Sequence, residues 1–126
     1  MKIIIYIIAL FYISLSQQDC HKKKATANTV YKGRLEIKGI CMNYTIKLLE
    51  GKMDTSLIAR EWTDETTGKV YTNVFALGNP CSFPSSIEQG EEFSFRIDTA
   101  KNQRCVVCLA YYPKPQQHLS IICTGK

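Results

Sequence analysis

Residues 71–108 read YTNVFALGNPCSFPSSIEQGEEFSFRIDTAKNQRCVVC. Apolar and polar side chains alternate on either side of a cysteine-containing loop, residues 78–84, as they do in strands that bury one face. The alternation predicts one strand over residues 70–77 and another that carries Phe93. After a polar turn, a third strand is predicted over residues 104–111. This order of strand, loop, strand, turn and strand indicates an all-β domain.

Upstream of this region, residues 30–38 alternate apolar and charged side chains, which predicts a half-buried strand. Beyond Gly39 the apolar side chains change parity, starting at Met42 and continuing at every second residue to Leu48. A bulge or sharp bend within one long strand produces such a change, and so does a tight hairpin at Lys38 and Gly39. Since a small closed barrel needs a bent first strand, we favour the bend.

Two shorter strands complete the pattern. Residues 57–62 end in the sole tryptophan, and a polar turn over residues 64–69 closes a hairpin onto residues 70–77. A last strand is predicted over residues 118–123, after the stiff Pro113-Lys114-Pro115 linker. No stretch keeps a helical period for three turns, so the five or six predicted strands indicate a small barrel or sandwich.

The amino terminus predicts export. Residues 1–16 combine Lys2, an apolar block and a small-residue cleavage site, so we expect a signal peptide followed by a secreted, extracellular domain of residues 17–126. No second apolar run approaches the length of a transmembrane helix, and no membrane anchor is expected. Loss of Lys2 lowers the formal net charge from +5 to +4. The remaining cations are too scattered to predict a nucleic-acid partner.

All six cysteines fall in the expected mature domain, and an even number in a short exported chain predicts three disulfides of open connectivity. Cys105 and Cys108 form a Cys-x-x-Cys motif, which in a redox site opens a helix. Here the motif falls in a predicted strand, whose residues three apart point to opposite faces, so each cysteine should have a different partner. The expected disulfide cysteines, with no free thiol, are Cys20, Cys41, Cys81, Cys105, Cys108 and Cys123.

The sequence contains no recognisable pattern of a catalytic, metal or cofactor site. It has no nucleophile elbow, no HExxH motif, no phosphate loop and no paired carboxylates in an apolar setting. His21 has no second histidine or carboxylate at ligand spacing, so no metal is expected there. We therefore expect a binding protein without a cofactor rather than an enzyme.

A glycosylation sequon is present at Asn43-Tyr44-Thr45. In a secreted chain this sequence is an acceptor for an N-linked glycan. Asn43 falls within a predicted strand, however, so glycosylation and its absence are equally weighted alternatives.

The order of cysteine, strand, turn, cysteine-bearing strand and proline resembles the netrin-like module of the tissue inhibitors of metalloproteinases. The resemblance covers most of the expected mature domain and implies a small disulfide-stabilised OB-like barrel, five-stranded and of Greek-key topology. It further implies a disulfide between Cys20 and Cys81, with Cys41 and Cys105 as an additional pair or as substitutes. The matching positions are residues 30–37 and 90–95, Cys81, Cys108 and Cys123.

One departure bears on activity. In that family the mature chain starts with Cys-x-Cys, and the amine and carbonyl of the first cysteine chelate the catalytic zinc of the protease. Here Gln17, Gln18 and Asp19 precede Cys20. Zinc chelation by this route therefore requires processing to Cys20.

The leading hypothesis is a secreted, monomeric protein-binding module that blocks an extracellular protease, and the resemblance implies a zinc metalloproteinase as the partner. The implied Cys20–Cys81 bridge would join the amino-terminal arm and the cysteine loop into one rigid ridge. Phe83 is the aromatic anchor of that loop, unless it packs beneath the loop. The expected partner-binding residues are Asp19, Cys20, His21, Asn79, Pro80, Ser82 and Phe83.

The alternative is a secreted effector that captures a host or signalling protein, or a small apolar ligand, without touching a protease. It would use the barrel face or another loop. The amino terminus of the mature protein separates the two, because a start at Cys20 favours chelation and a start at Gln17 favours capture.

Overall fold

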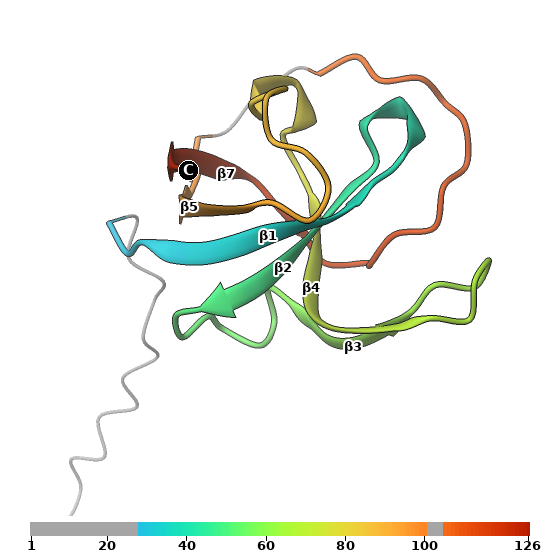
Figure 1. The fold of residues 1–126 in the computed structure, drawn as a ribbon, viewed down its shortest axis with the longest axis horizontal. Coiled ribbons are helices and arrows are strands. Elements are labelled where there is room, and N and C mark those ends of the chain that lie inside the picture. Colours follow the sequence, from blue (N-terminus) through green and yellow to red (C-terminus); the bar gives the residue numbers. More distant parts are fainter. Residues whose placement is uncertain (1–27, 101–104) are drawn as a thin grey trace, which may run out of the picture.

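Seven strands form one sheet in the computed structural model, which describes residues 28–100 and 105–126 (Figure 1). No α-helix occurs among these described residues, so the predicted all-β class is confirmed. None of their helices is long or apolar enough to cross a membrane. The elements are β1 (Tyr31–Lys38), the 3-10 helix η2 (Ile40–Met42), β2 (Tyr44–Glu50), β3 (Ala59–Thr63), β4 (Val70–Leu77), the 3-10 helix η3 (Pro80–Ser82), β5 (Glu92–Ile97), β6 (His118–Leu119) and β7 (Ile121–Gly125).

The sheet has the strand order β3-β4-β2-β1-β5-β7, and each neighbouring pair is antiparallel. Strand β6 pairs in parallel with β4, and only Ser120 separates β6 from β7. The last strand is thus divided: its first two residues pair with β4, and the rest pair with β5. Because no ladder joins β7 to β4 among the described strands, the predicted closure into a five-stranded barrel is not found.

Strands β1 and β2 form a hairpin rather than one long bent strand. Lys38 lies opposite Tyr44, and the Gly39 amide donates to the Asn43 carbonyl at 3.1 Å. The turn contains η2, in which Cys41 and Met42 adopt the left-handed backbone region with φ of 56° and 58°. The bend that we favoured from the sequence is therefore wrong, and the hairpin alternative is right. The alternation within β1 is confirmed, since every second residue is buried.

Strand β4 bends where it changes partners. Asn73 has φ of 54°, a conformation that asparagine tolerates better than most residues. Before this bend β4 pairs with β3, and from Val74 onward it also pairs with β2. Figure 1 shows the β3–β4 hairpin curving away from the rest of the sheet. Outside the core, Trp62 and Tyr71 stack with ring centroids 5.5 Å apart.

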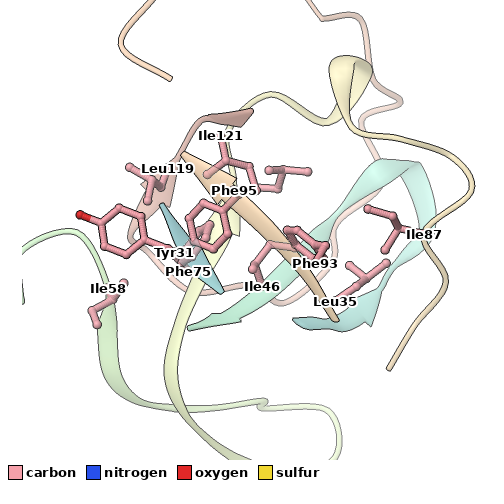
Figure 2. Close-up of a cluster of buried hydrophobic side chains, with 11 residues drawn as sticks. Tyr31, Leu35, Ile46, Ile58, Phe75, Ile87, Phe93, Phe95, Leu119 and Ile121 are labelled. Carbon is pink, nitrogen blue, oxygen red and sulfur yellow. The ribbon is translucent and has the colours of Figure 1, made fainter. Parts of the chain in front are cut away.

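The core centres on Phe95 (Figure 2). The rings of Phe75 and Phe93 each have their centroid 5.9 Å from that of Phe95, and the Tyr31 ring is at 5.5 Å. A Cβ at Gly33 would lie 2.9 Å from the Phe95 ring, so the absence of a side chain there makes room for the ring. The core cluster comprises Tyr31, Leu35, Ile46, Ile58, Phe75, Leu77, Ile87, Phe93, Phe95, Leu119 and Ile121.

The third strand predicted over residues 104–111 is wrong in its described part. Residues 105–111 form no strand and are largely exposed. The segment reads CVVCLAY, with no polar residue at alternate positions, so a strand there would need cover on both faces. The strands of residues 28–100 and 105–126 form a single sheet with no second layer to provide that cover, and Pro113 and Pro115 lack the amide that a ladder needs. The segment instead runs outside the strands without regular secondary structure, as a strap (Figure 1).

Candidate functional site

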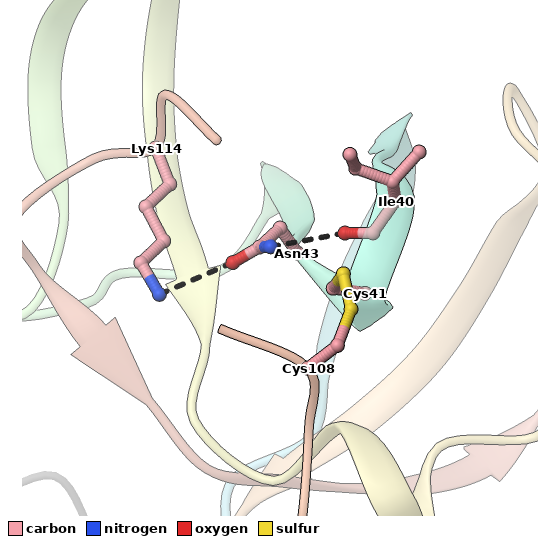
Figure 3. The surroundings of a disulfide bond; sticks show 5 residues. All are labelled: Ile40, Cys41, Asn43, Cys108 and Lys114. Atoms are coloured by element: carbon pink, nitrogen blue, oxygen red, sulfur yellow. Dashed lines mark hydrogen bonds between the residues drawn. A yellow bond between two sulfur atoms is a disulfide. The ribbon is translucent and has the colours of Figure 1, made fainter. Parts of the chain in front are cut away.

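Two disulfides tie the strap, residues 105–111, to two loops, and Figure 3 shows the one between Cys41 and Cys108. Cys105 is bonded to Cys81 in η3, with 5.6 Å between their Cα atoms, and Cys108 is bonded to Cys41 in η2, at 5.2 Å. The prediction that Cys105 and Cys108 have different partners is confirmed.

The pairing implied by the resemblance is wrong. Cys81 is bonded to Cys105 rather than to Cys20, and Cys41 is bonded to Cys108 rather than to Cys105. The physical reason is the path of the strap, which passes over both loops and brings its two cysteines within bonding distance of them. Cys81 is therefore not available for a bond to Cys20.

Cys123, on β7, is the cysteine of the described residues that remains outside a disulfide. It is half-buried, and burial raises the pKa of its thiol to about 11. Such a thiol is almost wholly protonated at neutral pH and reacts slowly, because the thiolate is the nucleophile. Cys20 lies outside the described residues, so the third predicted disulfide stays a prediction.

The disulfides display exposed apolar side chains, which we call the stapled platform. On the strap, Val106 and Leu109 are 94% and 99% exposed, and Ile40 beside Cys41 is 61% exposed. The bonds at Cys105 and Cys108 fix the strap to the loops that carry Cys81 and Cys41. The platform comprises Ile40, Met42, Val106, Val107 and Leu109.

A hollow of about 390 Å³ lies beside the platform. His118 and Lys114 both line this hollow. Burial of the His118 imidazole, together with the charge of Lys114, lowers the pKa of His118 below its usual value. The imidazole is therefore neutral at physiological pH and offers one donor and one acceptor. The hollow is lined by Cys41, Met42, Asn43, Tyr44, Leu77, Gly78, Pro80, Cys105, Val107, Lys114 and His118.

Asn79, predicted to contact a partner, is only 2% exposed and holds the loop in place. Its Nδ2 donates to the Ile121 carbonyl and to Ser82 Oγ, each at 2.8 Å, and its Oδ1 accepts from the Ile121 amide at 2.9 Å. Ser82 itself is exposed, and Pro80 lines the hollow. A side chain as buried as Asn79 offers a partner no surface.

Phe83 packs beneath the loop, which is the second of the two alternatives considered for it. Its ring lies edge-on to Phe93 at 5.3 Å and tilted to Tyr44 at 5.8 Å. Phe83 is thus half-buried against the core cluster. The remaining predicted contact residues, Asp19, Cys20 and His21, lie outside the described residues.

A second hollow, of about 610 Å³, separates β3 from the chain that follows the strap. The Tyr111 hydroxyl donates a hydrogen bond to Glu65 across it. β3 is an edge strand of the described sheet, since it pairs with β4 alone. The walls carry the opposite charges of Arg60, Glu61 and Lys114, so this hollow is more polar than the first.

The platform residues of the strap, Val106, Val107 and Leu109, were missed because residues 104–111 were assigned to a strand, which would hide apolar side chains. The available signal was the strap's composition, in which two cysteines bracket two valines without polar alternation. No group of three or more histidine, cysteine or carboxylate residues in the described part of the chain is placed to hold a metal.

Comparisons with protein-family models, with curated proteins and with solved structures find no match for this chain.

Proposed function

We propose that this protein is a secreted protein-binding module that docks through the stapled platform. Two disulfides in a domain of this size are typical of an extracellular, oxidising environment. The signal-like sequence at residues 1–16 supports export to that environment.

The observation that carries the proposal is the near-complete exposure of Val106 and Leu109 between two disulfides. Scattered apolar side chains are common on surfaces, but a cluster of them marks an interaction site. Burying the strap's two side chains in a partner would contribute about 1.5–3 kcal/mol each.

The platform is held in shape before any partner arrives. Cys41 and Met42 are both left-handed, which costs roughly 1–2 kcal/mol for each non-glycine residue. The Cys41–Cys108 bond supports this turn, and the Cys81–Cys105 bond fixes the other end of the strap. Because a partner need not order a rigid strap, less binding energy is lost to conformational entropy.

The partner that we propose first is an extracellular protease, a zinc metalloproteinase in particular, because of the resemblance to metalloproteinase inhibitors. The docking surface is the platform rather than the ridge expected from the sequence. The second candidate, capture of a host or signalling protein, is favoured by the apolar character of the platform, which carries no group suited to bind zinc.

The test replaces both strap side chains with charge, in the double variant Val106→Asp and Leu109→Asp. The matched control is Val70→Asp, because Val70 is also exposed, at 51%, and is the first residue of β4, outside the platform. Inhibition of a panel of zinc metalloproteinases is measured first. Partners are then sought in extracellular fluid by cross-linking, and each is produced pure for affinity measurement.

Loss of two hot-spot side chains should weaken binding by about 30-fold or more, whereas the control should bind as the wild type does. If the wild type inhibits a metalloproteinase and the double variant does not, the result supports a protease as the partner. Tight binding of another protein without inhibition supports capture. A double variant that binds every partner with wild-type affinity refutes docking through the platform.

A further inference from the structure

Thr45 carries a buried hydroxyl that contributes nothing visible to the folded protein. It lies in β2 between β1 and β4, opposite Ile37 and Ala76, and is fully buried. Its Oγ1 has no hydrogen-bond partner among the described residues. An unsatisfied buried hydroxyl is destabilising, and valine has nearly the same shape without that cost. The described part of the folded chain therefore gives no reason for threonine at this position.

The reason lies in the sequence context, since Thr45 is the third residue of the sequon that begins at Asn43. The enzyme that attaches N-linked glycans reads a hydroxyl at this position, and it acts on chains that have not yet folded. A hydroxyl that is useless after folding is thus accounted for by a role before folding. β-propensity alone does not account for it, because valine has that propensity as well.

The structure also removes the objection that Asn43 lies inside a strand. Asn43 comes between η2 and β2 in the hairpin turn, where the sequence placed it in a strand. Its Nδ2 donates to the Ile40 carbonyl at 2.9 Å, and its Oδ1 accepts from Lys114 Nζ at 3.3 Å (Figure 3). Since Nδ2 has two hydrogens, it can carry a sugar and still donate to Ile40.

A hollow of about 290 Å³ next to Asn43 suits the first sugar. Two tyrosines, Tyr111 and Tyr112, contribute to its wall, with Ala110 and Lys114. The C–H groups on one face of an N-acetylglucosamine ring pack favourably on the electron-rich face of an aromatic ring. The Tyr112 hydroxyl and Lys114 provide hydrogen-bond partners for the sugar oxygens, whereas the Tyr111 hydroxyl is bonded to Glu65 and only its ring is offered to the sugar.

We propose that Asn43 carries an N-linked glycan whose first N-acetylglucosamine lies against Tyr111. The donor is an oligosaccharide attached to a lipid diphosphate. Nδ2 of Asn43 bonds to C1 of the first sugar, the bond from C1 to the diphosphate breaks, and the lipid diphosphate leaves with the electron pair while Nδ2 loses one proton. The proposal rests on export, but not on any binding by the platform.

The first experiment expresses the full chain through the secretory pathway of insect or mammalian cells. Wild type and Thr45→Ser should carry a glycan. An amidase that removes this glycan converts Asn43 to aspartate, and in heavy-oxygen water the new aspartate is labelled with heavy oxygen. Thr45→Val and Asn43→Gln should carry none. An unmodified wild type overturns the proposal, and this result would leave the platform untouched.

A second measurement separates the hydroxyl's two roles. In the aglycosyl form, refolded from bacteria, Thr45→Val should melt no lower than the wild type. A clearly lower melting temperature would show that the hydroxyl is needed by the fold, and it would remove the argument from Thr45.

The third measurement tests where the first sugar lies. An endoglycosidase that leaves one N-acetylglucosamine on Asn43 should raise the melting temperature above that of the sugar-free protein by about 4 °C. The rise should disappear in Tyr111→Ala and persist in Glu65→Ala, which removes the hydrogen bond of Tyr111 but keeps its ring. An equal rise in Tyr111→Ala would refute packing of the sugar on Tyr111.

Discussion

Asn79 and Ile121 are paired as residues of neighbouring strands are, although Asn79 lies in a loop. Its side-chain amide both donates to and accepts from the backbone of Ile121, at 2.8 and 2.9 Å. This pair joins the Cys81 loop to the first residue of β7. Asn79 therefore supports the platform from within instead of forming part of its surface.

Replacing Asn79 with alanine should lower the free energy of unfolding by about 2–4 kcal/mol, since it leaves the Ile121 amide and carbonyl without partners. Denaturant unfolding measures the change. Ser85→Ala is the control, because Ser85 is exposed and its loss should cost less than about 1 kcal/mol. Equal destabilisation by the two variants would contradict the role given to Asn79.

Phe83→Ala should destabilise the protein by about 2–3 kcal/mol, because the ring packs on Phe93 and Tyr44. Partner affinity, measured well below the melting temperature, should stay near that of the wild type. The opposite result, unchanged stability with lost affinity, would return Phe83 to the binding surface.

Thiol titration of the unfolded, unreduced protein should find no free thiol, and a disulfide map should join Cys123 to Cys20. Tyr31, Phe95 and Cys123 lie in one row across β1, β5 and β7, so Cys123 is about 10 Å from the start of β1. Cys20 is eleven residues before Tyr31, a length of chain that reaches about 35 Å when extended. Two titratable thiols would show that the protein has only the two disulfides seen here.

Asp64 should make the β3–β4 hairpin sensitive to acid. Its Oδ1 accepts from Thr66 Oγ1 and from the Thr66 amide, and these bonds lower the pKa of the carboxyl below its ordinary value. The unfolded state therefore binds a proton more readily than the folded state does. The stabilisation is present above the unfolded-state pKa and is lost as the pH falls through the folded-state value.

Melting temperatures of wild type and Asp64→Asn, measured from pH 7 to pH 2, test this expectation. The wild type should melt higher at neutral pH, and the difference should shrink on acidification. When Thr66→Val is added to both proteins, the difference between their melting temperatures at neutral pH should become smaller. The reason is that the hydroxyl of Thr66 is the main cause of the lowered pKa of Asp64. A difference that does not change with pH would refute the role of the Asp64 charge.

The sequence predicted the strands well wherever one face meets the core. Alternation around Tyr31, Leu35, Phe93 and Phe95 is a local property, and burial of that face confirms it. The final strand was also placed correctly, except for its division at Ser120.

Prediction from the sequence failed where disulfides between distant cysteines determine the path of the chain. A Cys-x-x-Cys segment is apolar enough for a strand, and only the positions of Cys41 and Cys81 in space show that it is a strap. The candidate site depended on the same connectivity, since a bridge from Cys20 to Cys81 would have brought the arm to the loop. Six cysteines allow fifteen pairings, and spacing along the chain does not choose among them.

The two disulfides also determine what a protease in the surroundings can achieve. A single cut anywhere between Cys81 and Cys105 leaves the two pieces covalently joined through that bond, and a cut between Cys105 and Cys108 leaves them joined through Cys41. The most exposed peptide bonds next to the platform can therefore be nicked without releasing a fragment. Degradation at these sites needs a second cut or a reductant, and a nicked molecule would be recognised as two pieces only after reduction.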